Sequence, residues 1–163
     1  MKELLQKYTA YNHWANNEIV TALLKLPPEQ SEQELGGSFG TLRDTVLHIW
    51  NAESVWYQRL ILVEKPVRPG DNYTGAFADA CSAWVRQSKQ LADWVAAATP
   101  ARLGHVVAFT RQKNEHYKMQ VEDILMHACN HSTFHRGQIV HMLRQLGIKK
   151  VPSTDFNRYT NKI

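Results

Sequence analysis

The strongest constraint on the fold is the recurrence of apolar residues at helical spacing in four long segments of the chain. Steps of three and four residues place such side chains on one face of a helix, and that face must be buried against other helices. Helix-terminating residues follow the segments in turn: Pro27-Pro28, Pro66, Pro69, Pro100 and Gly147. The sequence therefore predicts an all-α, antiparallel four-helix bundle that forms a single domain over residues 1–163.

The apolar periodicity and the helix-terminating residues predict approximate ends for each of the four helices. Their approximate extents are Leu4 to Leu26, Thr41 to Val63, Phe77 to Ala98 with Thr74 as N-cap, and Val121 to Leu146. Residues 102–119 lack helical periodicity, and their apolar runs flank the polar residues 111–115, which predicts a short β-hairpin or an irregular crossover before the last helix. The polar tail from Ser153 to Ile163 is expected to pack loosely.

Composition places this chain among ordinary globular proteins, with 44% hydrophobic and 21% charged residues. No apolar run is long enough to span a membrane, and the N-terminal residues do not resemble a secretion signal. A cytoplasmic protein with reduced thiols at Cys81 and Cys129 is therefore expected. The net charge of +4 is spread along the chain, so neither nucleic acid nor membrane is an expected partner.

Two of the 8 histidines occupy positions of the fourth helix where the periodicity requires core residues. The buried stripe passes from Ala128 through His131 and His135 to Ile139. Residues four apart share a helix face, so both imidazoles can bind one metal ion. Hydrogen-bonded core histidines are the alternative. Two stacked imidazoles inside a bundle, however, need partners for several nitrogens, and a metal ion supplies two partners at once.

A third ligand is expected from a facing helix, and His48 is the best candidate, since it lies in the apolar sector of the second helix. Three protein ligands leave positions open for water or substrate, which suits catalysis better than a structural role. The expected divalent ion is Zn, Ni or Fe, because imidazole binds all of these. His127 is a near-site candidate. The remaining histidines are interpreted as surface residues or neighbours of the ligands: His13, His105, His116 and His141.

Several side chains near these histidines have two interpretations. Glu53 would orient a ligand imidazole or act as a base, or it is a buried carboxylate paired with Arg or Tyr. Arg136 would hold an anionic substrate or form a surface salt bridge. Gln138 is placed to support His135, and Cys129 is out of phase with the histidine pair. Two tryptophans near His48 either line a pocket or pack in the core: Trp50 and Trp56.

The chain also resembles the DinB family of metal-binding four-helix bundles in several blocks: Tyr11 to Asn16, Gly37 to Ile49, Ala52-Glu53 with Trp56, and Asn130 to Gln138. The resemblance spans almost the whole chain and is most specific around His131 to Gln138. It implies a bundle with a divalent metal held by His48, His131 and His135, and a homodimer. Family members often have a further histidine where this chain has Phe134, at a position that is not usually a ligand.

The resemblance also implies a class of reaction, because the wider superfamily includes S-transferases that use low-molecular-weight thiols. The leading hypothesis is a metal-dependent enzyme, either a thiol transferase or a hydrolase-like enzyme, that acts on a small molecule. A metal ion at three histidines would lower the pKa of a bound thiol or water and so present a nucleophile at neutral pH. The alternative is a metal-binding or stress-associated interaction protein that has no chemistry of its own.

Overall fold

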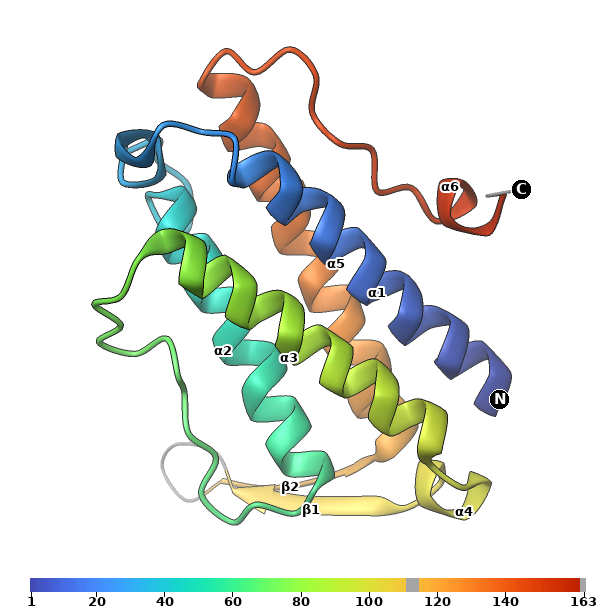
Figure 1. The fold of residues 1–163 in the computed structure, drawn as a ribbon. Coiled ribbons are helices and arrows are strands. Elements are labelled where there is room, and N and C mark those ends of the chain that lie inside the picture. The colour runs from blue at the N-terminus through green and yellow to red at the C-terminus, as the bar shows by residue number, and fades with distance from the viewer. Residues whose placement is uncertain (111–114, 162–163) are drawn as a thin grey trace.

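The computed structural model describes residues 1–110 and 115–161, and four long helices dominate it (Figure 1). They are α1 (Lys2–Leu23), α2 (Leu42–Leu60), α3 (Phe77–Ala97) and α5 (Val121–Gln145). Short helical elements join or follow them: η1 (Pro28–Ser31), α4 (Pro100–Leu103) and α6 (Phe156–Thr160). The four-helix bundle predicted from the periodicity is confirmed.

Each long helix has two long helices as principal neighbours, since α3 and α5 both pack against α1 and also against α2. The contacts between α1 and α3 and between α2 and α5 are antiparallel (Figure 1). The pairs α2–α3 and α1–α5 each run in one direction, because residues 61–76 carry the chain back along the bundle before α3 begins (Figure 1). This connection places α2 directly beside α5, the helix that carries the histidine pair.

The helix ends differ in detail from the expected ones. Thr41 caps α2, since its hydroxyl accepts a hydrogen bond from the backbone N–H of Asp44. The helix ends at Leu60 rather than Val63, and Leu62 has a positive φ of 63°. The expected N-cap Thr74 is wrong, because Ala76 precedes α3 and contributes no side-chain hydrogen bond. Likewise α1 ends at Leu23, before Leu26.

A β-hairpin precedes the last long helix, as one of the two expected alternatives. Strand β1 (Val106–Thr110) pairs antiparallel with β2 (His116–Gln120), with Val106 opposite Gln120. Of the polar residues expected at its centre, 111–115, residues 111–114 lie outside the described part of the chain. Because β2 leads directly into α5, the hairpin covers the end of the bundle where α5 begins (Figure 1).

The polar tail is mostly exposed and no residue of α6 is buried, in agreement with the expected loose packing, but aromatic contacts attach it to α1. The aromatic rings of α6 pack against α1, with Phe156 edge-on to Tyr11 at a centroid distance of 4.9 Å. The Tyr11 hydroxyl donates a hydrogen bond to the carbonyl of Thr154 over 2.7 Å. Three aromatic residues in α1 therefore receive the tail: Tyr8, Tyr11 and Trp14.

Two clusters of buried apolar side chains form the core. One includes Leu5, Trp56 and Leu125, and the other includes Ile49, Trp84 and Ile139. The helix positions between these clusters carry buried polar residues: Asn12, Asn16, Glu53, Ser132, His135 and Arg136. The bundle therefore has a polar layer in the middle of an otherwise apolar interior.

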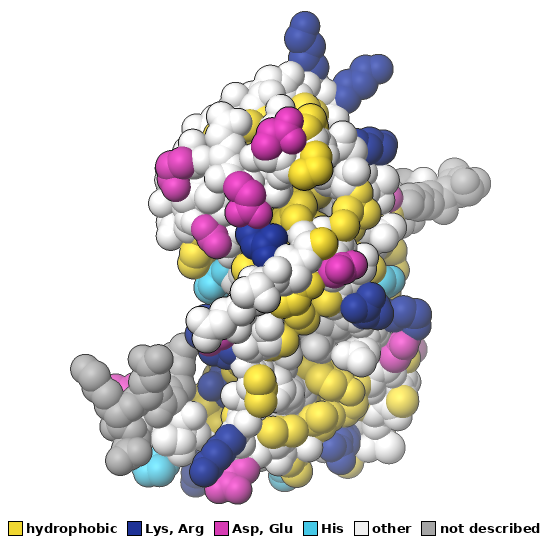
Figure 2. All heavy atoms as spheres, turned by 60° about the vertical axis from the view of Figure 1, so that its left-hand side comes forward, with side chains coloured by type: hydrophobic (Ala, Val, Ile, Leu, Met, Phe, Trp, Pro, Cys, Tyr) yellow, Lys and Arg dark blue, Asp and Glu magenta, His cyan; other side chains and the backbone are white. Residues whose placement is uncertain are grey.

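The surface is mixed in charge. Lys and Arg side chains are scattered among Asp and Glu side chains on the face shown in Figure 2. Within the described part of the chain, no helix has the length and apolar character needed to cross a bilayer.

Candidate metal centre

Three imidazoles meet where α2 packs against α5. His48 comes from α2, whereas His131 and His135 lie one turn apart on α5. The Nε2 atom of His48 is 3.0 Å from Nε2 of His131 and 3.1 Å from Nε2 of His135, and the latter two atoms are 3.1 Å apart. The structure thus brings together the three residues that the sequence predicted as ligands.

The chemistry of this cluster fits a cation better than a set of hydrogen bonds among the rings. A neutral imidazole has a single N–H, so three Nε2 atoms at mutual hydrogen-bond distance cannot all be satisfied by one another. Burial, together with neighbouring positive charge, lowers the pKa of His48 to about 4 and that of His131 to about 3. The two rings are therefore neutral at pH 7, which is the form that binds a metal ion. Nitrogens about 3 Å apart can each lie about 2.1 Å from one ion.

Two neighbouring side chains hold the imidazoles in place. The Oε1 atom of Gln138 lies 2.7 Å from Nδ1 of His135, which places the ring proton on Nδ1 and leaves Nε2 as an electron-pair donor. The Phe39 ring stacks on His48 at a centroid distance of 4.1 Å and also lies 5.5 Å from the ring of His135. The contact of Gln138 was expected from its spacing, whereas the role of Phe39 was missed.

Phe39 lies in a glycine-rich segment, residues 36–40, and this segment is the sequence feature that could have indicated its position. Gly36, Gly37 and Gly40 have positive φ values of 74°, 87° and 73°, a region that L-residues with a Cβ rarely adopt. A Cβ at Gly40 would also lie 2.6 Å from a carboxylate oxygen of Glu34. The loop before α2 can therefore fold back tightly enough to lay Phe39 against the histidines.

A cleft of about 680 Å³ opens beside the histidine cluster, and His48 and His131 form part of its wall. Other walls come from α2, from the segment after it, from the hairpin and from the start of α5. The aromatic and charged lining residues are Trp56, Arg59, Arg68, Glu115 and His127. His127 thus lies in the cleft, as expected of a near-site residue, but it is not one of the three clustered imidazoles.

The two arginines of the cleft were missed by sequence reasoning. The Arg59 guanidinium lies between two rings, 4.4 Å from the centroid of Trp56 and 4.2 Å from that of Phe109. Arg68 belongs to residues 61–76, which have no helical or strand pattern from which its position could be read. Trp56 is both buried in the core and part of the cleft wall, whereas Trp50 packs edge-on against Tyr73.

Glu53 and Arg136 belong to a buried hydrogen-bond network in the polar layer. Oε1 of Glu53 accepts hydrogen bonds from Asn12 (2.8 Å), Asn16 (2.9 Å) and Ser132 (2.7 Å). Arg136 donates to the Oδ1 atoms of both asparagines over 2.6 and 2.7 Å, so the amides bridge the guanidinium and the carboxylate. The expected surface salt bridge of Arg136 is wrong, because this side chain is only 1% exposed.

This network does not line the cleft, so the structure places Glu53 and Arg136 behind the metal centre rather than within it. Burial raises the pKa of the Glu53 carboxyl; the hydrogen bonds that the carboxylate accepts and the nearby charge of Arg136 partly oppose that rise. Glu53 fits the interpretation of a buried carboxylate, with Asn and Ser as its direct partners. A catalytic role for either residue stays a prediction.

The other polar candidates lie away from the cluster. His13 contacts the Ser88 hydroxyl between α1 and α3. Cys129 is buried as a free thiol and burial raises its pKa, in agreement with a packing role. The remaining histidines, which also lie outside the three-histidine cluster, are His105, His116 and His141.

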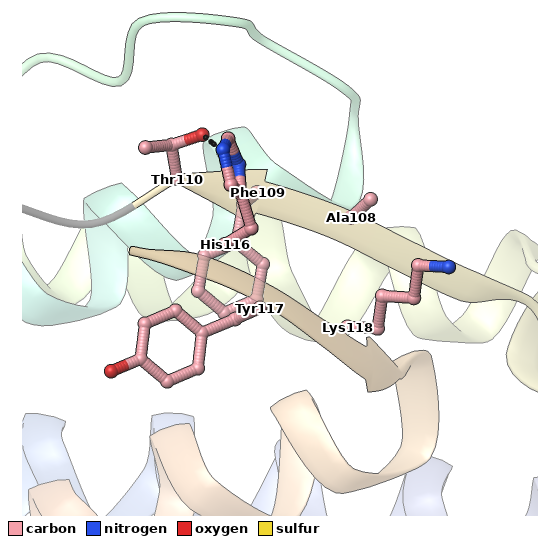
Figure 3. Close-up of a pocket in the computed structure, with 6 residues that line it drawn as sticks. All are labelled: Ala108, Phe109, Thr110, His116, Tyr117 and Lys118. Carbon is pink, nitrogen blue, oxygen red and sulfur yellow. Dashed lines mark hydrogen bonds between the residues drawn. The ribbon is translucent and has the colours of Figure 1, made fainter. Parts of the chain in front are cut away.

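A second pocket, of about 610 Å³, lies on the hairpin (Figure 3). Its lining comes from both strands, and the Nδ1 atom of His116 lies 3.2 Å from the Thr110 hydroxyl. No metal-binding group of the described residues falls among its lining side chains. The cleft beside the three histidines is therefore the stronger candidate for a reaction site.

Comparisons with known proteins agree in family and fold. The model of the DinB family matches residues 1–162. The curated Protein DinB of Bacillus subtilis strain 168 is 26% identical over 176 residues, which cover 98% of this chain and 95% of the relative. A DinB-like protein from Bacillus cereus ATCC 10987 superimposes with a TM-score of 0.67 at 21% identity, covering 85% of this chain and 89% of the other.

YfiT from Bacillus subtilis is a further structural neighbour, with a TM-score of 0.66 at 15% identity over 90% of both chains. It is described as a probable metal-dependent hydrolase with an unusual four-helix bundle topology. At such low identity, the likeness of these solved structures shows the fold alone.

Proposed function

The chain belongs to the DinB family, and from this premise we propose that it is a divalent-metal-dependent enzyme whose ion is held by His48, His131 and His135. The observation that carries the proposal is the meeting of three imidazole Nε2 atoms, 3.0–3.1 Å apart, at the wall of a cleft of about 680 Å³. Within the described ranges, no fourth His, Cys or carboxylate joins the group. An open coordination position next to a cleft is typical of catalytic rather than structural metal sites.

We propose that the reaction is thiol-dependent S-transfer to a small electrophile. A bound divalent ion would lower the pKa of a thiol or water beside it. The thiol loses its proton, its sulfur forms a C–S bond with the electrophilic carbon, and the leaving group departs with the electrons of the broken bond. We assign the thiol proton to His127, because its imidazole lies on the cleft wall beside His131.

A second candidate is metal-dependent hydrolysis, which is favoured by the likeness to YfiT. Water would then replace the thiol as the nucleophile, with the same histidines and the same cleft. Gln138 and Phe39 have the same role in both candidates, since they orient His135 and His48. A non-catalytic metal-binding protein is the outcome if metal binds and no reaction is found.

The proposal extends to a cytoplasmic homodimer that acts on a small molecule. Two large apolar side chains of α5, Phe134 at 65% and Met126 at 47% exposed, are candidates for the surface that a dimer would bury. Light scattering on the purified protein measures the mass directly. A monomer at every concentration tested would refute the dimer and leave the metal centre unaffected.

The decisive experiment is metal analysis of protein purified without added metal, for the wild type and for His48→Ala, His131→Ala and His135→Ala. His141→Ala is the matched control, because His141 is exposed on the same helix and lies outside the cluster. We expect the three variants to lose metal and the control to keep it. Full metal content in all three would refute the site.

Activity is then tested with the metal-loaded protein in two screens. One supplies several low-molecular-weight thiols with electrophiles and measures thiol consumption, and the other supplies esters and amides and measures hydrolysis. Thiol consumption that depends on His131 supports S-transfer. Hydrolysis without any thiol supports the second candidate and contradicts the first.

A further inference from the structure

Arg68 occupies an irregular segment, and its side chain, which is 55% exposed, is hydrogen-bonded to a neighbour that contacts α2 beside the metal centre. Its Nε lies 3.1 and 3.0 Å from the two carboxylate oxygens of Asp71. Asp71 in turn accepts a hydrogen bond from Nδ2 of Asn51 over 3.0 Å. Asn51 is buried in α2, one turn after His48, so the position of Arg68 is tied to the helix that supplies a metal ligand.

The backbone at this point also packs closely on α2. Oδ1 of Asn51 accepts a hydrogen bond of 2.6 Å from the N–H of Gly70. A Cβ at Gly70 would lie 3.0 Å from that same oxygen and 3.1 Å from the carbonyl oxygen of Leu47. Only glycine fits this approach without displacing its neighbours, which indicates that the turn around Arg68 is a built feature rather than a slack loop.

The ion pair with Asp71 engages the Nε atom of the Arg68 guanidinium and leaves its two Nη groups for another ligand. Within residues 1–110 and 115–161, neither Nη of Arg68 makes a hydrogen bond to the protein. Two parallel N–H groups on a guanidinium match the two oxygens of a carboxylate or a phosphate. Because Arg68 and His48 line the same cleft, an anion bound there would lie beside the metal centre.

The charged side chains of the cleft also favour an anionic ligand. Arg59 and Arg68 are cationic, and Glu115 is the one acidic side chain among the described lining residues. Arg59 is held between the rings of Trp56 and Phe109, so its guanidinium stays at the cleft wall. A divalent ion at the histidines would add to the positive charge of the two arginines, and a net positive charge in a cleft favours anionic ligands.

We propose that Arg68 is a specificity residue that binds a carboxylate or phosphate group of the substrate, so that this enzyme acts on anionic small molecules. The inference rests on the proposed function in one respect, since it takes this cleft as the reaction site. The anionic group belongs either to the thiol or to its reaction partner, and the chemistry of recognition is the same for both.

The test compares wild type with Arg68→Gln and uses Arg86→Gln as the matched control. Arg86 is exposed on α3 and does not line the cleft, so its substitution removes the same charge elsewhere. Calorimetry measures the affinity for inorganic phosphate, using each protein with the metal content that it has on purification. We expect binding to weaken about ten- to a hundredfold in Arg68→Gln and to change less than about twofold in the control.

A pair of thiols then decides which reactant carries the anion. In Co²⁺-loaded protein, binding of 3-mercaptopropionate and of neutral 2-mercaptoethanol is followed through the sulfur-to-cobalt absorption band. Tighter binding of the carboxylate thiol, lost in Arg68→Gln, assigns the anion to the thiol. Equal binding of the two thiols, with phosphate binding still dependent on Arg68, assigns it to the reaction partner.

The outcomes separate this inference from the function on which it rests. Phosphate affinity that is absent in wild type, or equal in wild type and Arg68→Gln, overturns the role of Arg68 even if metal and activity are found. Protein that holds no metal but binds phosphate through Arg68 overturns the proposed metal-dependent function and retains the anion site.

Discussion

Removal of the Glu53 carboxylate tests whether the polar layer stabilises the bundle that carries the metal centre. Glu53 is 1% exposed, and its Oε1 is the shared acceptor of three side chains that come from α1 and α5. In Glu53→Ala, the donors from Asn12, Asn16 and Ser132 would lose that acceptor, and the buried Arg136 would lose its neighbouring negative charge. Glu53→Gln keeps an acceptor oxygen at nearly the same place, removes the charge and replaces the second oxygen, Oε2, with an NH2 group.

The expected loss of unfolding free energy depends on which buried groups each variant leaves without a partner. A buried donor without a partner costs about 1–3 kcal/mol, and breaking a buried charge pair by removing one partner costs about 3–5 kcal/mol. The bridging asparagines can turn toward one another's oxygens, so the terms do not add in full. We expect Glu53→Ala to lower the free energy of unfolding by about 3–5 kcal/mol, which is a fall in Tm of roughly 6–20 °C for a chain of this size. Glu53→Gln should cost about 1–2 kcal/mol.

The assay is urea unfolding of metal-free protein, followed by circular dichroism in the presence of a chelator. Thr9→Ala is the control for loss of a buried polar side chain, because among the described residues the Thr9 hydroxyl bonds only to carbonyls of its own helix. We expect this control to cost less than about 1.5 kcal/mol. A Glu53→Ala protein within about 1 kcal/mol of wild type would refute the reasoning, since the network would then contribute nothing.

Acidification is expected to destabilise the metal-free protein. The pKa values of His48 and His131 are lowered from 6.5 to about 4 and about 3, so the unfolded chain takes up protons that the folded one does not. Their contribution is complete above pH 6.5 and is lost as the pH falls toward 4 for His48 and toward 3 for His131. Chemical unfolding at several pH values measures this loss, and unchanged stability at pH 4.5 would contradict it. Phe39→Ala should weaken metal binding about two- to tenfold in a chelator competition, because the ring that stacks on His48 is removed. Equal affinity would show that the stack does not orient the ligand. Cys81 and Cys129 should react with a thiol reagent only as fast as the protein unfolds, because both are buried and burial raises the pKa of Cys81 to about 12. Rapid labelling of the native protein would show that one of them is accessible.

Much of the fold and the core of the site could be predicted because they depend on short-range order. The four long helices follow from apolar spacing within each segment, and the phase of α5 places His131 and His135 on one face whatever packs against it. The same logic located Gln138, since a residue three positions on lies over the same turn as His135.

Other features could not be read from spacing because they depend on unpatterned segments. Residues 36–40 carry Phe39 to His48, and residues 61–76 carry Arg68 into the cleft, but neither segment has a periodicity that predicts its path. The tail had too few apolar residues to indicate burial, yet three aromatic rings of α1 form a surface on which Phe156 and Tyr159 pack.

By itself, the sequence determined where the helices lie and that two histidines of the last long helix point inward, because both depend on hydrogen bonds and neighbours a few residues away. Only the tertiary structure decided that α2 packs beside that pair and so brings His48, which the sequence offered as a candidate, into the three-histidine cluster. Burial of apolar stripes is non-directional and does not specify which helices become neighbours. The long return of residues 61–76 and the packing of the whole bundle make that choice, and with it they place His48, Phe39 and Arg68 around one cleft.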